Sequence, residues 1–262
     1  MNIVVCVKQV PDSAAKVVAQ GGQVSWGDAP LVLNPWDEYA VEAALMLQEA
    51  AGGDVTVISV GEEGAKEALK TALAMGCSQA VLISDPALSQ ADSQAVAHVL
   101  AAAIRKIGSV DAAGSVDAAF FGRQAIDGDM GVTAAQTAHL LMWPMLGLIS
   151  TLKAEDGKLR VERSFEEGRQ VVECQLPAAV SVSKDIGEPR YPSFMGIRKA
   201  SRATIPTWDL AELGISAPAS VVRWPELINP PAREVKTELI TGGSPQEIAE
   251  KLADRILEEK VL

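Results

Sequence analysis

The chain has 262 residues, of which 48 % are hydrophobic, and it carries a formal net charge of −11 at pH 7. This length allows one large domain with a substantial core, and the composition excludes wholesale disorder. The acidic balance excludes a surface that binds nucleic acid or anionic membranes, because such surfaces need clustered lysine and arginine.

The chain has none of the sequence features of a secreted or membrane protein. The apolar segment NIVVCV has no basic region before it and is too short for a signal peptide. The longest apolar stretch, HLLMWPMLGLI, contains Pro144 and is far shorter than the roughly 18 residues that a membrane span needs. Cys6, Cys77 and Cys174 share no metal-ligand spacing. We therefore expect a cytoplasmic protein with reduced thiols and no membrane insertion.

The first half of the chain predicts strands that alternate with helices. Short apolar runs are typical of strands covered on both faces, and they occur at NIVVCVK (2–8), DVTVISV (54–60), AVLIS (80–84) and DAAFF (117–121). Helical patterns lie between them at 34–50, 63–76 and 89–108. This alternation predicts a Rossmann-like, doubly wound α/β fold with a mostly parallel sheet.

Two local features of this half carry separate expectations. Asn34 is expected to cap the first helix, with Pro35 at its first position and Asp37 in its first turn. The tandem repeat SVDAAGSVDAA (109–119) is expected to be a tolerated loop insertion, because surface loops absorb extra length at low cost.

The second half predicts an antiparallel extension of the same sheet. Apolar and polar residues alternate in four segments, with turn sequences EDGK and EEGR between the first three; the segments are 148–155, 158–165, 169–176 and 178–184. We expect an α/β domain over 1–215. The proline-rich stretch 216–234 and a final helix, which has a capping box of Ser244 and Glu247, make an arm over 216–262 that is expected to pack on a partner subunit.

Known catalytic patterns are missing from the sequence. It contains no G-x-S-x-G, H-E-x-x-H, C-x-x-C or P-loop motif, and no G-x-G-x-x-G after the first strand. His98 and His139 lie in helical patterns among alanine and leucine. These observations favour binding over catalysis and predict no catalytic and no metal-binding residue.

The loop GRQAIDGDMG (122–131) is the best candidate for a binding site. It follows a predicted strand and precedes a helix, at the edge where α/β sheets bind nucleotides. Its two aspartates, Asp127 and Asp129, are unexpected beside a phosphate, although an aspartate can also form the turn or accept from ribose hydroxyls. The residue pattern leaves both roles open.

Five motifs, taken together, resemble one known family. They are VCVKQVPD (5–12), NPWDEYAVEAAL (34–45), TALAMG (71–76), GRQAIDGD (122–129) and EPRYPSFMGIRKA (188–200). In order and spacing they resemble the small, β subunit of electron-transfer flavoprotein over essentially the whole chain. The resemblance implies a heterodimer with a larger α subunit, which holds most of a redox-active FAD that the β subunit completes. It also implies a structural AMP in the β subunit, which is an electron carrier subunit and not an enzyme.

By position, the resemblance assigns the AMP site to four segments that follow strands or begin a helix. The assigned residues are Cys6, Asn34, Pro35, Trp36, Asp37, Gly61, Glu62, Gly122, Arg123, Gln124, Asp127, Asp129, Met130, Gly131, Val132 and Thr133. The backbone amides of 130–133 would face the phosphate, and Asp127 would brace the turn.

Departures from the family pattern leave alternatives for the nucleotide. Relatives that bind a second FAD in place of AMP, and split electron pairs between two acceptors, typically continue the loop motif with Thr-Ala-Gln-Val-Gly and carry an acidic residue after Asn-Pro. Here Met130 follows the motif and the bulky Trp36 follows Pro35, which favours AMP. A bifurcating flavoprotein with a second FAD is the first alternative. A free-standing adenine-nucleotide-binding stress-type protein is the second.

The segment 188–200 is expected to be a partner-docking loop, because it shows neither a strand pattern nor a strong helix pattern. Family members place there a protruding leucine that anchors a dehydrogenase, and Phe194 occupies that position, with Tyr191 and Met195 beside it. The resemblance implies docking of flavin dehydrogenases, such as acyl-CoA dehydrogenases, and onward transfer of electrons to a quinone oxidoreductase.

Overall fold

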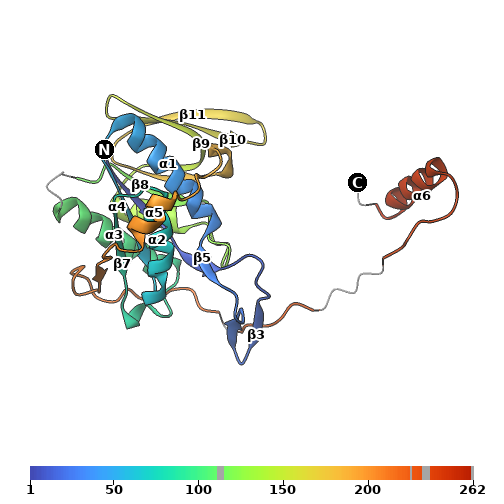
Figure 1. Cartoon of the computed structure of the whole chain (residues 1–262), viewed down its shortest axis with the longest axis horizontal. Coiled ribbons are helices and arrows are strands. Elements are labelled where there is room, and N and C mark those ends of the chain that lie inside the picture. The colour runs from blue at the N-terminus through green and yellow to red at the C-terminus, as the bar shows by residue number, and fades with distance from the viewer. Residues whose placement is uncertain (111–114, 225, 232–236, 261–262) are drawn as a thin grey trace. The chain divides into compact units, whose positions relative to one another are not determined.

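A computed structural model of the chain describes residues 1–110, 115–224, 226–231 and 237–260 (Figure 1). These residues form two compact units, Met1–Leu227 and Ile228–Leu262. The division falls later in the chain than residue 215, because residues 220–222 hydrogen-bond within the first unit. The repeat at 109–119 lies partly outside the described residues, so its expected insertion stays a prediction.

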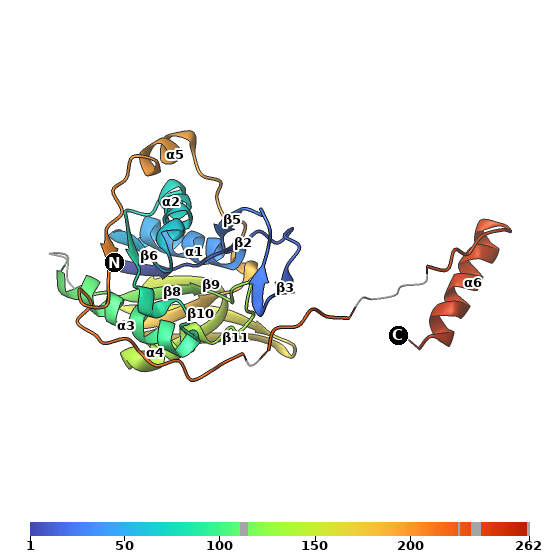
Figure 2. The ribbon, with the colours of Figure 1, turned by 90° about the horizontal axis from the view of Figure 1, so that it is seen from below.

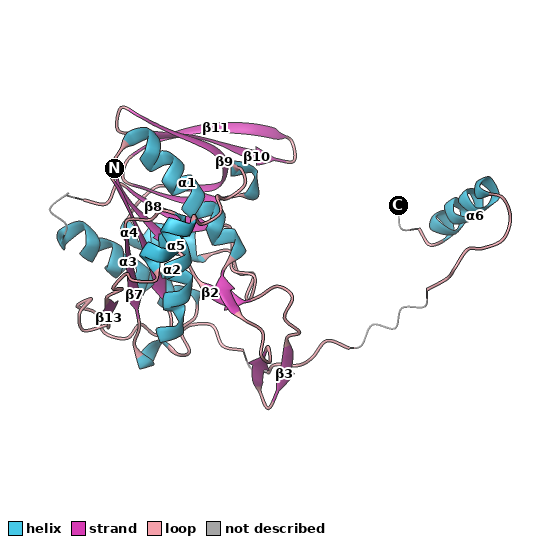
Figure 3. Ribbon diagram, viewed as in Figure 1, coloured by secondary structure: helices cyan, strands magenta, loops and turns pink. Residues whose placement is uncertain are grey.

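A nine-stranded sheet, counted over the described residues, forms the centre of the first unit (Figure 3). In spatial order its strands are β11 (Gly168–Gln175), β10 (Lys158–Phe165), β9 (Met145–Glu155), β12 (Ala178–Val182), β8 (Ala118–Gly122), β1 (Asn2–Cys6), β6 (Asp54–Val60), β7 (Gln79–Ile83) and β13 (Thr207–Trp208). Neighbours pair in parallel from β9 to β13, and β10 pairs antiparallel with both β9 and β11. The predicted doubly wound, mostly parallel α/β fold is confirmed.

Helices cover both faces of this sheet. In Figure 2, α1 (Pro35–Ala51) and α2 (Lys66–Met75) lie on one side, and α3 (Ser93–Val110) and α4 (Thr133–Leu141) lie on the other. Alternate side chains of a strand point to opposite faces, so β1 places Val5 in the core under α1 and α2 and places Val4 in the core under α3. Burial on both faces explains why these strands read as continuous apolar runs.

Short elements complete the first unit. The strands β2 (Gln9–Pro11) and β5 (Leu31–Leu33) form one antiparallel pair, and β3 (Val18–Gln20) and β4 (Gln23–Ser25) form another. Three 3₁₀ turns are Glu63–Ala65, Pro86–Leu88 and Lys184–Ile186. The sequence predicted none of the four short strands, because each is only three residues long and shows no full alternation period.

The prediction that 178–184 belongs to the antiparallel extension is wrong. β12 is fully buried and pairs in parallel with β8 and β9. The serines of this segment suggested that one face of the strand is exposed to solvent, but their hydroxyl groups make hydrogen bonds to neighbouring backbone. The Ser181 hydroxyl accepts from the Leu148 amide at 3.0 Å, and the nearby Ser183 hydroxyl donates to the Ile149 carbonyl at 3.0 Å. The other three predicted segments do form the antiparallel strands β9 to β11.

The expectation that 188–200 is a loop throughout is also wrong, because α5 (Phe194–Ala200) begins within it. The Ser193 hydroxyl caps this helix by accepting from the Gly196 amide at 2.9 Å. Glycine has a low helix propensity, so the presence of Gly196 made this short helix hard to predict from sequence. A Cβ at Gly196 would collide with the Ala74 carbonyl oxygen of α2, which is why glycine is needed at this helix contact.

The second unit contains α6 (Pro245–Glu258). The predicted capping box is confirmed, because Ser244 accepts from the Glu247 amide at 3.3 Å and Glu247 accepts from the Ser244 amide at 2.6 Å. None of the residues of α6 is buried. Among the described residues, no helix is both long enough and apolar enough to cross a membrane.

Candidate functional site

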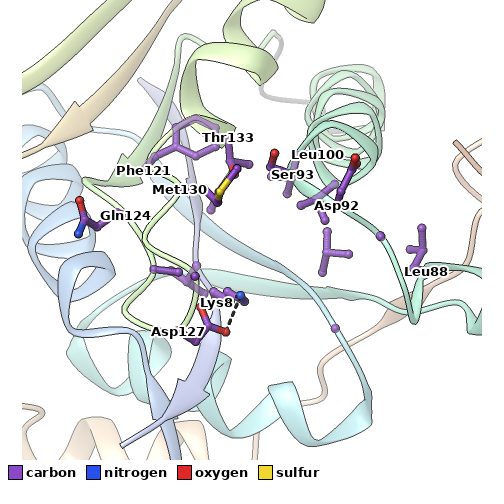
Figure 4. A pocket seen from close by; sticks show the side chains of 18 of the residues that line it. Lys8, Leu88, Asp92, Ser93, Leu100, Phe121, Gln124, Asp127, Met130 and Thr133 are labelled. Atoms are coloured by element: carbon purple, nitrogen blue, oxygen red, sulfur yellow. Dashed lines mark hydrogen bonds and ion pairs between the residues drawn. The ribbon is translucent and has the colours of Figure 1, made fainter. Parts of the chain in front are cut away.

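One cavity of about 660 Å³ lies at the carboxyl ends of β1, β6, β7 and β8 (Figure 4). This is the edge at which parallel α/β sheets bind ligands. Most of the residues assigned from sequence line it: Cys6, Asp37, Gly61, Glu62, Gly122, Arg123, Gln124, Asp127, Asp129, Met130, Gly131 and Thr133. The fold therefore brings four separate loops to one cavity.

Asn34 holds the loop after β8 instead of capping α1. It occupies the residue before the helix, but its side chain makes no capping hydrogen bond. Its Nδ2 donates to the Gln124 carbonyl at 2.8 Å, and its Oδ1 accepts from the Ile126 amide at 3.2 Å. Asn34 is thus at the predicted N-cap position, but its fully buried side-chain amide bonds the loop backbone, ninety residues later in sequence, instead of the helix.

Asp37 joins the ends of β1 and β8 beneath the cavity. Its Oδ2 accepts from the Lys8 amide at 2.8 Å. A Cβ at Gly122 would collide with the Asp37 carboxylate and would lie 2.6 Å from the Trp36 carbonyl oxygen, so only glycine allows this close approach. Burial raises the pKa of Asp37 to about 7, against the opposing effect of hydrogen bonds that include the Lys8 amide.

The acidic loop is partly neutralised by its neighbours. The Lys8 ammonium group contacts both carboxylate oxygens of Asp127, at 2.6 and 2.8 Å (Figure 4). The Gln124 side-chain amide donates to Asp129 Oδ1 at 2.6 Å. Each aspartate is therefore engaged by a side chain that also lines the cavity, which reduces the repulsion that a phosphate would meet.

The end of this loop carries backbone N–H groups that donate to no acceptor among the described residues. Asp129 and Gly131 have left-handed φ angles of 51° and 62°, which turn successive backbone amides toward one concave side. Within the described residues, the amides of 130–132 donate no hydrogen bond. They lie just before α4, whose N-terminus carries a partial positive charge. This donor set fits a phosphate group.

Four residues assigned from sequence are not in the cavity lining: Asn34, Pro35, Trp36 and Val132. The Trp36 ring lies instead against the Arg123 guanidinium, 5.4 Å from its Cζ, and beside Tyr39. The part of the preference for AMP that rests on the bulk of Trp36 is therefore not supported by its position.

Sequence reasoning missed one whole side of the cavity. Ser84 and Asp85 follow β7, and Asp92 and Ser93 begin α3 on the same side, as Figure 4 shows for the latter two. The sequence pattern could have indicated Ser84 and Asp85, because β7 ends at the same sheet edge as β1, β6 and β8. No signal pointed to the strap, which we define as residues 220–224, although its Val222 and Trp224 also line the cavity.

Cys6 lines the cavity from the end of β1. Burial raises the pKa of the Cys6 thiol well above its ordinary value, so this cysteine is a neutral core group. Among the described residues, no cluster of histidine, cysteine, aspartate or glutamate is placed to hold a metal ion. The lining offers backbone amides, the side chains of Lys8 and Arg123, and apolar walls.

The segment that begins α5 presents apolar side chains to solvent. Tyr191, Phe194 and Met195 are 96 %, 80 % and 68 % exposed. Just before them, the Arg190 guanidinium donates to the Glu42 carboxylate at 2.8 and 2.9 Å and to Glu49 at 2.6 Å. Both glutamates lie on α1, so the base of the exposed segment is fixed to the domain.

Comparison with known proteins places the chain in a family. The electron transfer flavoprotein domain matches residues 26–213. The caffeyl-CoA reductase-Etf complex subunit CarD of Acetobacterium woodii is 36 % identical over the full length of both chains. The electron transfer flavoprotein subunit beta is 35 % identical over the full length of both chains in Megasphaera elsdenii, and 33 % identical in Bacillus subtilis over 99 % of this chain and 98 % of the relative. The chain therefore belongs to the electron transfer flavoprotein family, as a β subunit, whose members carry electrons.

Proposed function

We propose that this chain binds AMP in the cavity, completes the FAD site of a larger α subunit, and docks a flavin dehydrogenase whose electrons pass on to a quinone oxidoreductase. The observation that carries the nucleotide assignment is the donor-rich loop end at 130–132, next to an aspartate that Lys8 neutralises. The FAD, when bound to the heterodimer, supplies the electron-carrying chemistry. This chain supplies the binding surfaces, in a cytoplasmic setting.

The lining of the cavity suits the other parts of AMP. The amides of 130–132 are assigned to the phosphate. Phe121, Leu100 and Val96 form an apolar wall that suits the purine. Asn34 and Asp37 act beneath the nucleotide, because Asn34 hydrogen-bonds the loop at Gln124 and Asp37 hydrogen-bonds the Lys8 amide at the end of β1.

The exposed segment before and within α5 is the proposed docking surface. Phe194 and Met195 can lose water on docking, and they stand on a short helix whose base is fixed by the Arg190 ion pairs. A preorganised apolar anchor loses little entropy on binding and can act as a hot spot. This supports a dehydrogenase partner with an apolar pocket.

Co-expression with the large-subunit gene tests the heterodimer. We expect a yellow complex of two chains with the visible absorption spectrum of a flavin. A colourless, stable single chain from the co-expression would contradict the proposed subunit role, whatever nucleotide that chain carried.

A second candidate function, a bifurcating flavoprotein with a second FAD in the cavity, is favoured by one observation. Trp36, whose bulk favoured AMP, is not among the lining residues of a cavity of about 660 Å³. The altered continuation at Met130 still favours AMP. The two candidates differ in the nucleotides that denaturation releases.

A further inference from the structure

The strap, residues 220–224, is fastened to the beginning of α3 by one carboxylate. Asp92 Oδ2 accepts hydrogen bonds from the backbone amides of Val221 and Val222, both at 2.7 Å. The Ser220 hydroxyl accepts from the Asp92 amide at 3.1 Å and donates to the Gln90 carbonyl at 2.9 Å. Four hydrogen bonds therefore join a segment without regular structure to one helix end.

The two oxygens of this carboxylate have separate roles. Asp92 Oδ1 accepts from the Ala95 amide at 2.8 Å, which caps α3, whereas Oδ2 accepts from the two strap amides. These hydrogen bonds lower the pKa of Asp92, led by that from Ala95, so the group stays ionised at neutral pH. Hydrogen bonds to an ionised acceptor are about twice as strong as neutral ones.

The strap also forms part of the cavity. Val222 and Trp224 line it together with Leu88 and Asp92, on the side formed by the turn after β7 and the start of α3. The Trp224 side chain is largely exposed, at 68 %, so its neighbours do not hold it in place. Its position along the cavity therefore depends on the backbone hydrogen bonds two and three residues earlier.

We propose that Asp92 is a positioning residue that fastens the strap along the cavity, so that Val222 and Trp224 slow the release of the bound nucleotide. The inference rests on the proposed nucleotide site. Release of the strap breaks two charge-assisted hydrogen bonds and removes the two side chains from the cavity wall. Loss of Asp92 Oδ2 is expected to raise the dissociation rate of the nucleotide about tenfold, while its association rate changes little.

The substitution Asp92→Asn separates the two roles of the side chain. An asparagine keeps an oxygen for the Ala95 amide and remains a good helix cap, but its NH₂ group cannot accept from Val221 or Val222. The matched control is Asp209→Asn, because Asp209 likewise accepts from the amide three residues later, Glu212, and lies outside the cavity lining. Trp224→Ala removes the strap's largest side chain without touching the carboxylate.

The measurement is the exchange of radiolabelled AMP, and in parallel of FAD, from the full-length chain in its heterodimer against excess unlabelled nucleotide. We expect Asp92→Asn and Trp224→Ala to release the retained nucleotide about tenfold faster than the wild type, and Asp209→Asn to match the wild type. The variant Trp224→Phe identifies the part of the fluorescence emission that comes from Trp224. In Asp92→Asn this part should shift to longer wavelengths, because a detached strap leaves Trp224 in water.

The outcomes distinguish the two proposals. If the wild type retains neither AMP nor a second FAD beyond the one shared with the large subunit, the proposed site fails and the strap inference fails with it. If the wild type retains one, and both Asp92→Asn and Trp224→Ala release it at the wild-type rate, only the strap inference is overturned. If Asp92→Asn does not fold, the release rate of Trp224→Ala decides alone: an unchanged rate overturns the inference and a tenfold rise supports it.

Discussion

The ammonium group of Lys8 and the carboxylate of Asp127 form an ion pair with a contact of 2.6 Å, although 119 positions separate them in sequence. Lys8 follows β1 and Asp127 lies in the loop after β8, and both line the same cavity. The pair explains how a loop with two aspartates can face an anion. One negative charge is compensated inside the site, and the amides of 130–132, which donate to no acceptor among the described residues, remain for the ligand.

Lys8→Met should weaken AMP binding about tenfold, because it leaves the Asp127 carboxylate uncompensated near the phosphate. The free energy of unfolding should change by less than about 1 kcal/mol, since both side chains are partly exposed. Calorimetric titration with AMP and denaturant unfolding check the two expectations. The matched control is Lys70→Met, which breaks the Lys70–Glu67 pair of α2 outside the cavity. The double variant Lys8→Met/Asp127→Asn should bind AMP more tightly than Lys8→Met alone. If it does not, the loss of affinity in Lys8→Met is not caused by the unpaired Asp127.

Asp37 should make stability fall as pH rises from about 4 to about 7. Its pKa is raised to about 7 in the folded chain and is near 4 in the unfolded chain. Between these values only the folded state keeps the proton, so each pH unit costs up to about 1.4 kcal/mol of stability. Below about 4 and above about 7 the contribution is flat.

The difference in unfolding free energy between the wild type and Asp37→Asn isolates this group, because the asparagine does not titrate. As pH rises from about 4 to about 7, we expect the unfolding free energy of the wild type to fall relative to that of Asp37→Asn. A difference that stays constant from pH 4 to 8 would mean that Asp37 is ionised throughout.

Gly131→Leu should lose bound nucleotide. Gly131 has a φ of +62°, where a side chain costs about 1–2 kcal/mol, and a leucine there would crowd the amides that face the ligand. Gly157→Leu is the control, because Gly157 has a φ of +74° in the β9–β10 turn with open space around it. Both variants should lose similar stability by thermal unfolding, and only Gly131→Leu should lose AMP on purification. Equal AMP content in the two would show that the loop is only a turn.

Phe194→Ala should weaken docking of the cognate dehydrogenase by about 2 kcal/mol, roughly thirtyfold in affinity. The reason is that Phe194 is 80 % exposed on a segment fixed by Arg190, so it contributes to a partner and not to the core. Steady-state reduction of the heterodimer by the dehydrogenase measures the effect, with dithionite reduction as a control. Phe165→Ala, at the exposed end of β10, is the matched variant. Reduction of Phe194→Ala at wild-type efficiency would remove it as the anchor.

Deletion of 228–262 should abolish the heterodimer and leave the first unit folded. The second unit includes α6, in which no residue is buried, so its apolar residues are available for another surface. The cut after Leu227 preserves the strap. Size-exclusion chromatography after co-expression provides the test. Co-elution of the truncated chain with the large subunit would show that the second unit does not hold the dimer.

The elements that the sequence predicted share one physical signal. β1, β6, β7 and β8 are buried on both faces and therefore read as apolar runs, and their order along the chain sets the sheet edge at which the site forms. The loop after β8 was found for the same reason, because a glycine-rich turn between strand and helix follows directly from this alternation.

What the sequence did not predict depends on contacts between distant residues. Asn34 is of a residue type that favours helix caps, yet its side chain hydrogen-bonds the loop at Gln124. The serine of β12 at 181 suggests a solvated face, yet it serves the Leu148 amide inside the sheet. The strap has no periodicity, and only its hydrogen bonds to Asp92 place it at the cavity. In each case a polar group that is satisfied at long range has no local signature.

The most direct test is the identity and stoichiometry of the nucleotides that denaturation releases from the purified heterodimer. We expect one AMP and one FAD for each pair of chains. Two FAD and no AMP would contradict the AMP assignment and establish the bifurcating candidate. One FAD with no second nucleotide would contradict the cavity itself as a nucleotide site.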